Sequence, residues 1–159
     1  MKAGKMQPSY SLHADKRTVP IWLRSVLAIA AGFIVWFAAA TVGNLLVRLL
    51  VPGYAEVEKA MNFSLAMLLA RLVLGAGASV VAGIACAAVT PKARWPVYVF
   101  ALLLLALFVP VHVSLWDKFP IWYHIVFLGS LFPLVLLGAR MLGSRGGVRP
   151  DTAQGTERV

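Results

Sequence analysis

Four polar residues stand within or beside apolar stretches of this chain, and their types are those that carry chemistry: Arg71, His112, Asp117 and His124. A neutral imidazole can hold a transition metal or relay a proton. The spacing His-x4-Asp-x6-His matches no standard zinc signature. The sequence therefore predicts no bound metal or cofactor. A hydrogen-bonded anchor and a proton or polar-ligand role stay open for the two histidines, and a haem or metal pair is the weakest alternative.

Arg71 is the least expected of these residues. It lies eight positions after Phe63, or about 12 Å along a helix, and a charge near the bilayer centre costs about 2.5–3.5 kcal/mol on insertion scales. Small neighbours suggest that it points inward. One interpretation is structural, with snorkelling or an ion pair to Asp117, Glu56 or Glu58. The other is contact with an anion or a lipid headgroup in an outward-facing cavity.

Asn44 and Arg48 lie near the end of the first apolar stretch and extend this set to six residues. Asn44 is a natural partner for an interhelical hydrogen bond. Asp117 also precedes Pro120 and can serve as a helix cap. We predict that Arg71 meets the two histidines and Asp117 in a polar cluster below the outer surface. No HExxH, nucleotide-loop or GxSxG motif accompanies the set, so the sequence favours a non-enzymatic protein.

The elements that must position these residues are membrane-spanning helices. The chain of 159 residues is 60% hydrophobic and only 13% charged, and several runs reach the ~20 apolar residues that a spanning helix needs. Barrel-type alternation is absent, which leaves an all-α membrane protein with a four-helix bundle. We expect helices at about 21–50, 63–89, 96–115 and 120–142, with disordered tails at 1–20 and 143–159.

Lysine and arginine predict the orientation of this bundle. Most of the 15 basic residues fall on one side of the expected membrane: Lys2, Lys5, Lys16, Arg17, Arg24, Lys92, Arg94, Arg140, Arg145, Arg149 and Arg158. Both termini are therefore expected in the cytoplasm. The net charge of +9 then reflects topology and contact with anionic lipid, not nucleic-acid binding.

Aromatic residues gather where the helices should enter and leave the bilayer. Trp and Tyr favour this interface because their rings are apolar and their tips polar. We expect five interface anchors: Trp22, Trp95, Trp116, Trp122 and Tyr123. Cys86 is the single cysteine, which excludes an intramolecular disulfide, a CxxC pair and the thiol oxidoreductases that need several cysteines.

Small residues recur every four positions in the second expected helix. Gly75, Ser79 and Gly83 share one face with Ala87, and membrane helices associate through close packing of such residues. We expect another helix of the chain to cover this face. A homodimer seam is the alternative.

The segment "WDKFPIWYHIVFLGSLFPLVLLGARML" opens the last helix and fits a W-D-x-x-P-x-W-Y-H-x-x-F-L pattern, followed by Pro133 and Gly138. In this it resembles small uncharacterised bacterial four-helix inner-membrane proteins. The first helix, with "AAGFIVWFAAATVGNLL", is similar more loosely. The resemblance spans residues 21–142 and implies the architecture, but no activity.

Three functions fit these observations. The first is a non-enzymatic accessory, assembly or lipid-contacting subunit, whose partners are the bilayer and either a second copy or another membrane protein. The second is a small transporter or permease that uses the polar cluster. It would differ from the small multidrug exporters, which need an acidic residue in helix 1 that this chain lacks. The third is a haem or metal-binding redox protein.

Overall fold

The structure is a computed structural model that describes residues 19–90 and 93–144. The expected disordered tails lie almost wholly outside these ranges. The described residues form five helices and no strand, in the order α1 (Ile21–Leu50), α2 (Tyr54–Glu58), α3 (Leu65–Val89), α4 (Trp95–Ser114) and α5 (Ile121–Ser144). Four of them, α1, α3, α4 and α5, are long and apolar enough to cross a membrane. The predicted all-α four-helix class is confirmed.

Local sequence explains where the helices begin and end. Pro20 precedes α1, and its fixed φ of −58° suits a helix entry. Ser64 caps α3, since its hydroxyl accepts a hydrogen bond from the backbone N–H of Met67 at 3.4 Å. Gly53 precedes α2 with a φ of 74°, a conformation that glycine adopts without strain. This turn allows the chain to fold back toward the bundle directly after α1.

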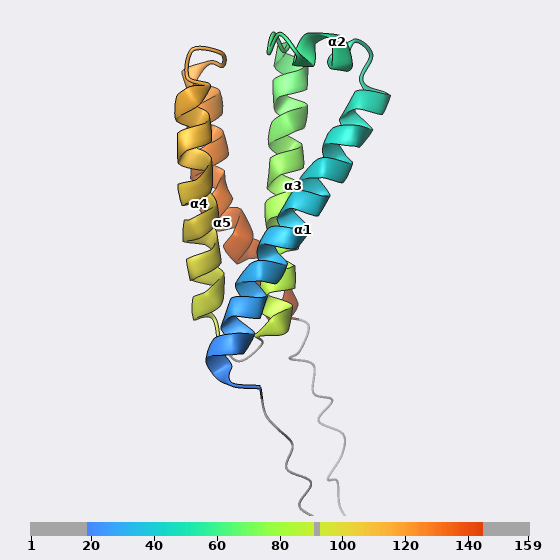
Figure 1. The fold of residues 1–159 in the computed structure, drawn as a ribbon. Coiled ribbons are helices and arrows are strands. Elements are labelled where there is room, and N and C mark those ends of the chain that lie inside the picture. The colour runs from blue at the N-terminus through green and yellow to red at the C-terminus, as the bar shows by residue number, and fades with distance from the viewer. Residues whose placement is uncertain (1–18, 91–92, 145–159) are drawn as a thin grey trace, which may run out of the picture.

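The bundle has two distinct ends (Figure 1). One end carries α2 and the turn between α4 and α5, and we call it the α2 end. The other carries the start of α1, the link between α3 and α4 and the end of α5, and we call it the basic end. The first span, α1, thus begins at the same end of the bundle at which the last span, α5, ends.

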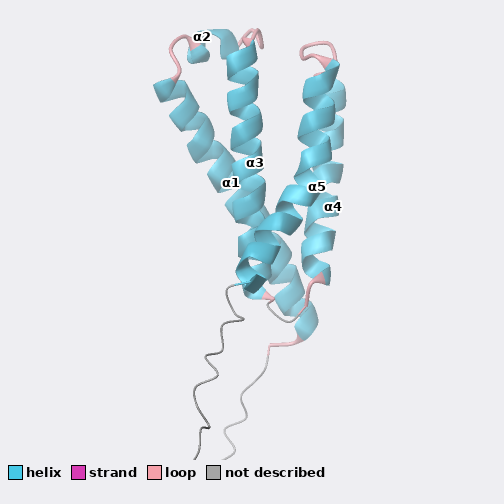
Figure 2. Ribbon diagram, turned by 180° about the vertical axis from the view of Figure 1, so that it is seen from behind, coloured by secondary structure: helices cyan, strands magenta, loops and turns pink. Residues whose placement is uncertain are grey.

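The helix α3 is the central element, because it packs extensively against both α1 and α5. α5 runs beside α4 near the α2 end and changes direction part-way toward α3, as Figure 2 shows from behind. Pro133 lies within α5, and a proline inside a helix removes a backbone hydrogen bond and bends the axis. The bend brings the second half of α5 against α3.

Reciprocal glycine contacts make the crossing of α3 and α5 very close. A Cβ atom added at Gly83 would overlap the carbonyl oxygen of Val135, and one added at Gly138 would overlap that of Val80. Only glycine lets the two backbones approach in this way. The small-residue face of α3 is therefore covered within the chain at this level.

A hydrogen bond joins α1 to α3 in the core. The indole N–H of Trp36 donates to the hydroxyl of Ser79 at 3.2 Å, and that hydroxyl donates to the carbonyl of Gly75 at 2.7 Å. Both side chains are buried. Aromatic and small aliphatic residues fill the space around them, among them Ala82, Phe100 and Leu104.

Candidate functional site

A buried tyrosine organises the polar residues at the α2 end. Tyr54 begins α2 and is fully buried. Its hydroxyl accepts a hydrogen bond from Nη1 of Arg71 at 2.7 Å and donates one to Oδ1 of Asn44 at 3.3 Å. One side chain from the short helix thus links α1 to α3.

The chain of contacts continues from Asn44 to the surface. Nδ2 of Asn44 donates to one carboxylate oxygen of Glu58 at 3.3 Å, and Nε of Arg48 donates to the other at 2.6 Å. We call these five residues, Arg48, Glu58, Asn44, Tyr54 and Arg71, the α2-end network. It runs from an exposed ion pair to a part-buried guanidinium.

The carboxylate of Glu58 is held in its charged form. Partial burial raises its pKa, but the hydrogen bonds from Arg48 and Asn44, with the charges of Arg48 and Arg71, outweigh burial and lower the pKa below its ordinary value. Arg71 therefore acts on Glu58 through space although the two do not form an ion pair.

Arg71 is surrounded by neutral groups. Its guanidinium carbon lies 4.8 Å from the ring centroid of Phe63, a cation–π contact. The Tyr123 side chain also interacts with it. None of the described carboxylates forms an ion pair with Arg71, and its buried Nε atom has no hydrogen-bond partner among the described residues. The charge is thus stabilised by hydroxyl groups and an aromatic face.

The two histidines meet next to this network. Nδ1 of His112 and Nδ1 of His124 lie 2.8 Å apart, and both side chains are buried. A hydrogen bond between two neutral rings requires one Nδ1 to carry a proton and the other to accept it. Trp116 stacks on His124 with 5.0 Å between ring centroids. Arg71 interacts electrostatically with His112.

One buried ring nitrogen of this pair has no partner among the described residues. Nε2 of His124 is buried and has no hydrogen bond within the described part of the chain. If His124 donates from Nδ1, Nε2 is a free lone pair; if it accepts, Nε2 carries a proton. No group of three His, Cys, Asp or Glu residues suited to a metal ion occurs in the described ranges.

Of the six predicted residues, His112 and His124 pair with each other, and Arg71 interacts electrostatically with His112. Hydrogen bonds through Tyr54 and Glu58 join Arg71 to Asn44 and Arg48. Asp117 is exposed, and its side chain makes no hydrogen bond or ion pair with described residues. It also lies outside the first turn of α5.

The expected interface anchors divide into two groups. Trp22, Trp95, Trp116 and Trp122 are exposed. Tyr123 is only 3% exposed and packs against Leu68 and Phe119. Its neighbour His112 stacks on it with 6.0 Å between centroids.

Sequence reasoning did not find the role of Tyr54. The residue stood in a short polar link and was not considered as a partner for Arg71. The available signal was local: a hydroxyl-bearing aromatic directly after Pro52 and Gly53, where a turn must redirect the chain.

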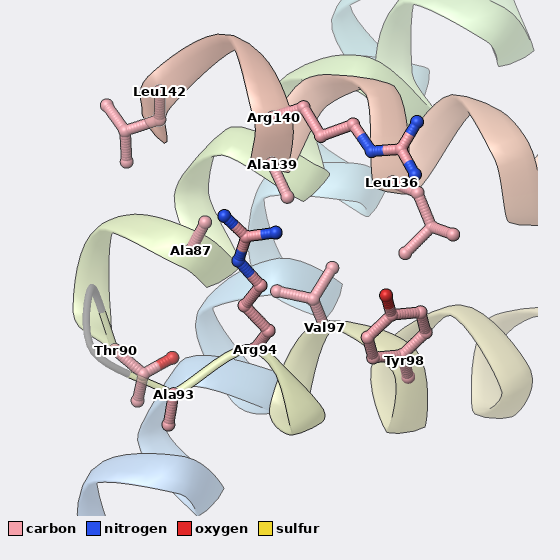
Figure 3. A pocket seen from close by; sticks show the side chains of 10 residues that line it. All are labelled: Ala87, Thr90, Ala93, Arg94, Val97, Tyr98, Leu136, Ala139, Arg140 and Leu142. Atoms are coloured by element: carbon pink, nitrogen blue, oxygen red, sulfur yellow. The ribbon is translucent and has the colours of Figure 1, made fainter. Parts of the chain in front are cut away.

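A second candidate site lies at the basic end. A cavity of about 300 Å³ opens between the end of α3, the start of α4 and the end of α5 (Figure 3). Two guanidinium groups line it, from Arg94 and Arg140, together with the ring of Tyr98. The sequence had assigned these arginines to topology, not to a cavity.

Comparison with protein-family models, curated proteins and solved structures found no match to this chain. The four spans indicate a multi-pass membrane protein. Its function must be argued from its own residues.

Proposed function

We propose that the chain is a non-enzymatic protein of the bacterial inner membrane, an accessory, assembly or lipid-contacting subunit with both termini in the cytoplasm. The distribution of charge supports this orientation, since lysine and arginine gather on the cytoplasmic side of membrane proteins. The described acidic residues, Glu56, Glu58 and Asp117, all belong to the α2 end. The basic end therefore faces the cytoplasm in this proposal.

The mutual hydrogen bonding of the α2-end network carries the proposal. Tyr54 is fully buried, and its hydroxyl is engaged by both Arg71 and Asn44. His112 and His124 are bonded to each other. Side chains committed in this way hold helices in register. A transport site, by contrast, needs polar groups that are free to exchange partners with a substrate.

A small permease is the second candidate, and two observations favour it. Nε of Arg71 and Nε2 of His124 are buried without hydrogen-bond partners among the described residues. A groove of about 390 Å³ also runs along α1 beside Asn44 and Arg48. Buried nitrogens without partners, and separately a groove with polar side chains, would suit an anionic or polar substrate.

Complementation separates the two functions. Cells that lack the protein are supplied with wild type, Arg71→Gln, His124→Phe or Arg24→Gln, the last being a control on an exposed arginine far from the network. Membrane levels are matched by quantitative immunoblotting. For a structural network, every variant that reaches normal levels restores the wild-type phenotype. If Arg71→Gln or His124→Phe is folded at normal levels and fails to complement, the permease is favoured.

A further inference from the structure

The cavity at the basic end has a polar rim and an apolar floor. Arg94, Arg140 and Tyr98 contribute polar groups, whereas Val97 and Leu136 contribute apolar surface (Figure 3). These side chains come from the start of α4, with its N-cap residue Arg94, and from the second half of α5, and they line one space. This combination suits a ligand with a charged head and an apolar body.

The described residues around the cavity give the basic end a positive charge. Within residues 19–90 and 93–144, the basic end carries Arg24, Arg94 and Arg140 and no aspartate or glutamate. The first turn of α4 also lines the cavity, through Val97 next to the N-cap residue Arg94. The N-terminus of a helix carries a partial positive charge and adds to the attraction for an anion.

The cavity lies beside Trp95, a residue expected at the headgroup level of a bilayer. Trp95, which begins α4, is exposed, as expected of an interface anchor. Arg94 precedes it, and Arg140 lies in the last turns of α5. Arginine binds phosphate with two parallel hydrogen bonds, and lipid phosphates occupy this level of a membrane.

We propose that this cavity binds the phosphate of an anionic phospholipid, with Arg94 and Arg140 as its ligands and an acyl chain along Leu136. This lipid site rests on the proposed function, because it requires the chain to be a lipid-contacting membrane protein. A free phosphorylated solute offers the same phosphate chemistry. The apolar floor favours the lipid, because a soluble phosphate gains nothing from it.

Native mass spectrometry of the full chain in non-ionic detergent tests the site. Phosphatidylglycerol and phosphatidylcholine with identical acyl chains are titrated onto wild type and onto the Arg94→Gln/Arg140→Gln double variant. Both lipids carry the same phosphate, but the two guanidinium groups repel the choline cation of phosphatidylcholine. We therefore expect wild type to bind phosphatidylglycerol about tenfold more tightly than phosphatidylcholine, and the double variant to lose this preference. Arg24→Gln, which removes a charge at the same end outside the cavity, should keep it.

A second variant keeps the test valid if the double variant does not fold. Ala139→Leu fills the cavity and leaves both arginines in place, so it should weaken phosphatidylglycerol binding without changing net charge. Inorganic phosphate is added as a competitor. If phosphate at millimolar concentration displaces the lipid, the ligand of the cavity is a soluble phosphate and the proposed lipid site is overturned.

The remaining outcomes separate the inference from the proposed function. Equal binding of both lipids by wild type, or equal loss of preference in Arg24→Gln and the double variant, overturns the site and leaves a lipid-contacting protein intact. Failure of wild type to retain any phospholipid counts against the lipid-contacting function itself.

Discussion

Nη1 of Arg71 and the hydroxyl of Tyr54 lie 2.7 Å apart, although one residue belongs to a membrane span and the other to a five-residue helix outside the spans. The bond fixes α2 over the end of the bundle and supplies a buried cation with an acceptor. α2 is therefore a structural part of the bundle and more than a connection between spans.

Tyr54→Phe removes that acceptor and keeps the ring. We expect a loss of about 1.5–3 kcal/mol in the free energy of unfolding, the range for hydrogen bonds to charged groups. Cys86 is the single cysteine and is fully buried, so its labelling by a maleimide during heating in detergent reports unfolding. Tyr98→Phe, at an exposed tyrosine of the basic end, is the control. Equal midpoints for the two variants would show that the bond contributes nothing.

Gly83→Ala and Gly138→Ala should each disrupt the crossing of α3 and α5, because the added methyl group would overlap a backbone carbonyl. Overpacking of this kind costs about 1–3 kcal/mol. Each glycine has a matched control in its own helix: a Cβ at Gly77 or at Gly129 meets nothing within 4 Å. Those controls should be neutral or stabilising, since alanine favours helix. Unfolding midpoints in detergent check all four, and a tolerant Gly83 would contradict the close crossing.

Ser79→Ala leaves the indole N–H of Trp36 without its acceptor. Hydrogen bonds between membrane helices are worth about 0.6 kcal/mol on average and up to about 1.7, and we expect a cost within that range. Ser79 also bonds Gly75, so a double-mutant cycle with Trp36→Phe is needed to isolate the pair. A coupling energy of zero in that cycle would assign the cost to the Gly75 contact alone.

The lowered pKa of Glu58 predicts a pH dependence. Because its pKa in the folded state lies below the unfolded value of about 4.3, the charged carboxylate stabilises the fold above that value, and the contribution is lost as pH falls through the folded pKa. Arg48 is half exposed, so we expect less than about 1 kcal/mol. Wild type should lose more stability than Glu58→Gln between about pH 6 and about pH 3, a window that spans the ordinary pKa of a glutamate. Parallel curves would contradict the prediction.

The sequence predicted the four spans because a long apolar run in a membrane must satisfy its own backbone hydrogen bonds, and a helix does so. It also predicted that the small-residue face of α3 would be covered, since Gly75, Ser79 and Gly83 recur at helical spacing. It indicated the first helix as a possible partner, but not that α5 would also cover this face. The contact with α5 depends on the bend at Pro133 and on Gly138, whose partner Val80 is 58 positions away and cannot be read from local pattern.

The polar residues show the same division. Small neighbours suggested that Arg71 points inward, and the structure gives it a part-buried position. Its partner Tyr54 could not be predicted, because the path of the chain through the turn at Gly53 brings Tyr54 to Arg71, and no sequence pattern specifies that path. Tyr123 was expected at the membrane interface from its position near the start of α5. The direction of its side chain depends on the rotation of α5 about its own axis relative to the neighbouring helices. The position of Tyr123 along the chain does not specify that rotation.

The reciprocal contact of Gly83 with Val135 and of Gly138 with Val80 also has a consequence for the order of assembly. Its two halves lie on α3 and α5, so it cannot form until the ribosome has completed α4 and the last helix. Through most of synthesis, lipid must cover the small residues of α3 that later receive α5. A chain arrested after α4 would therefore present the membrane's quality-control proteases with a bundle whose central helix is uncovered on one side.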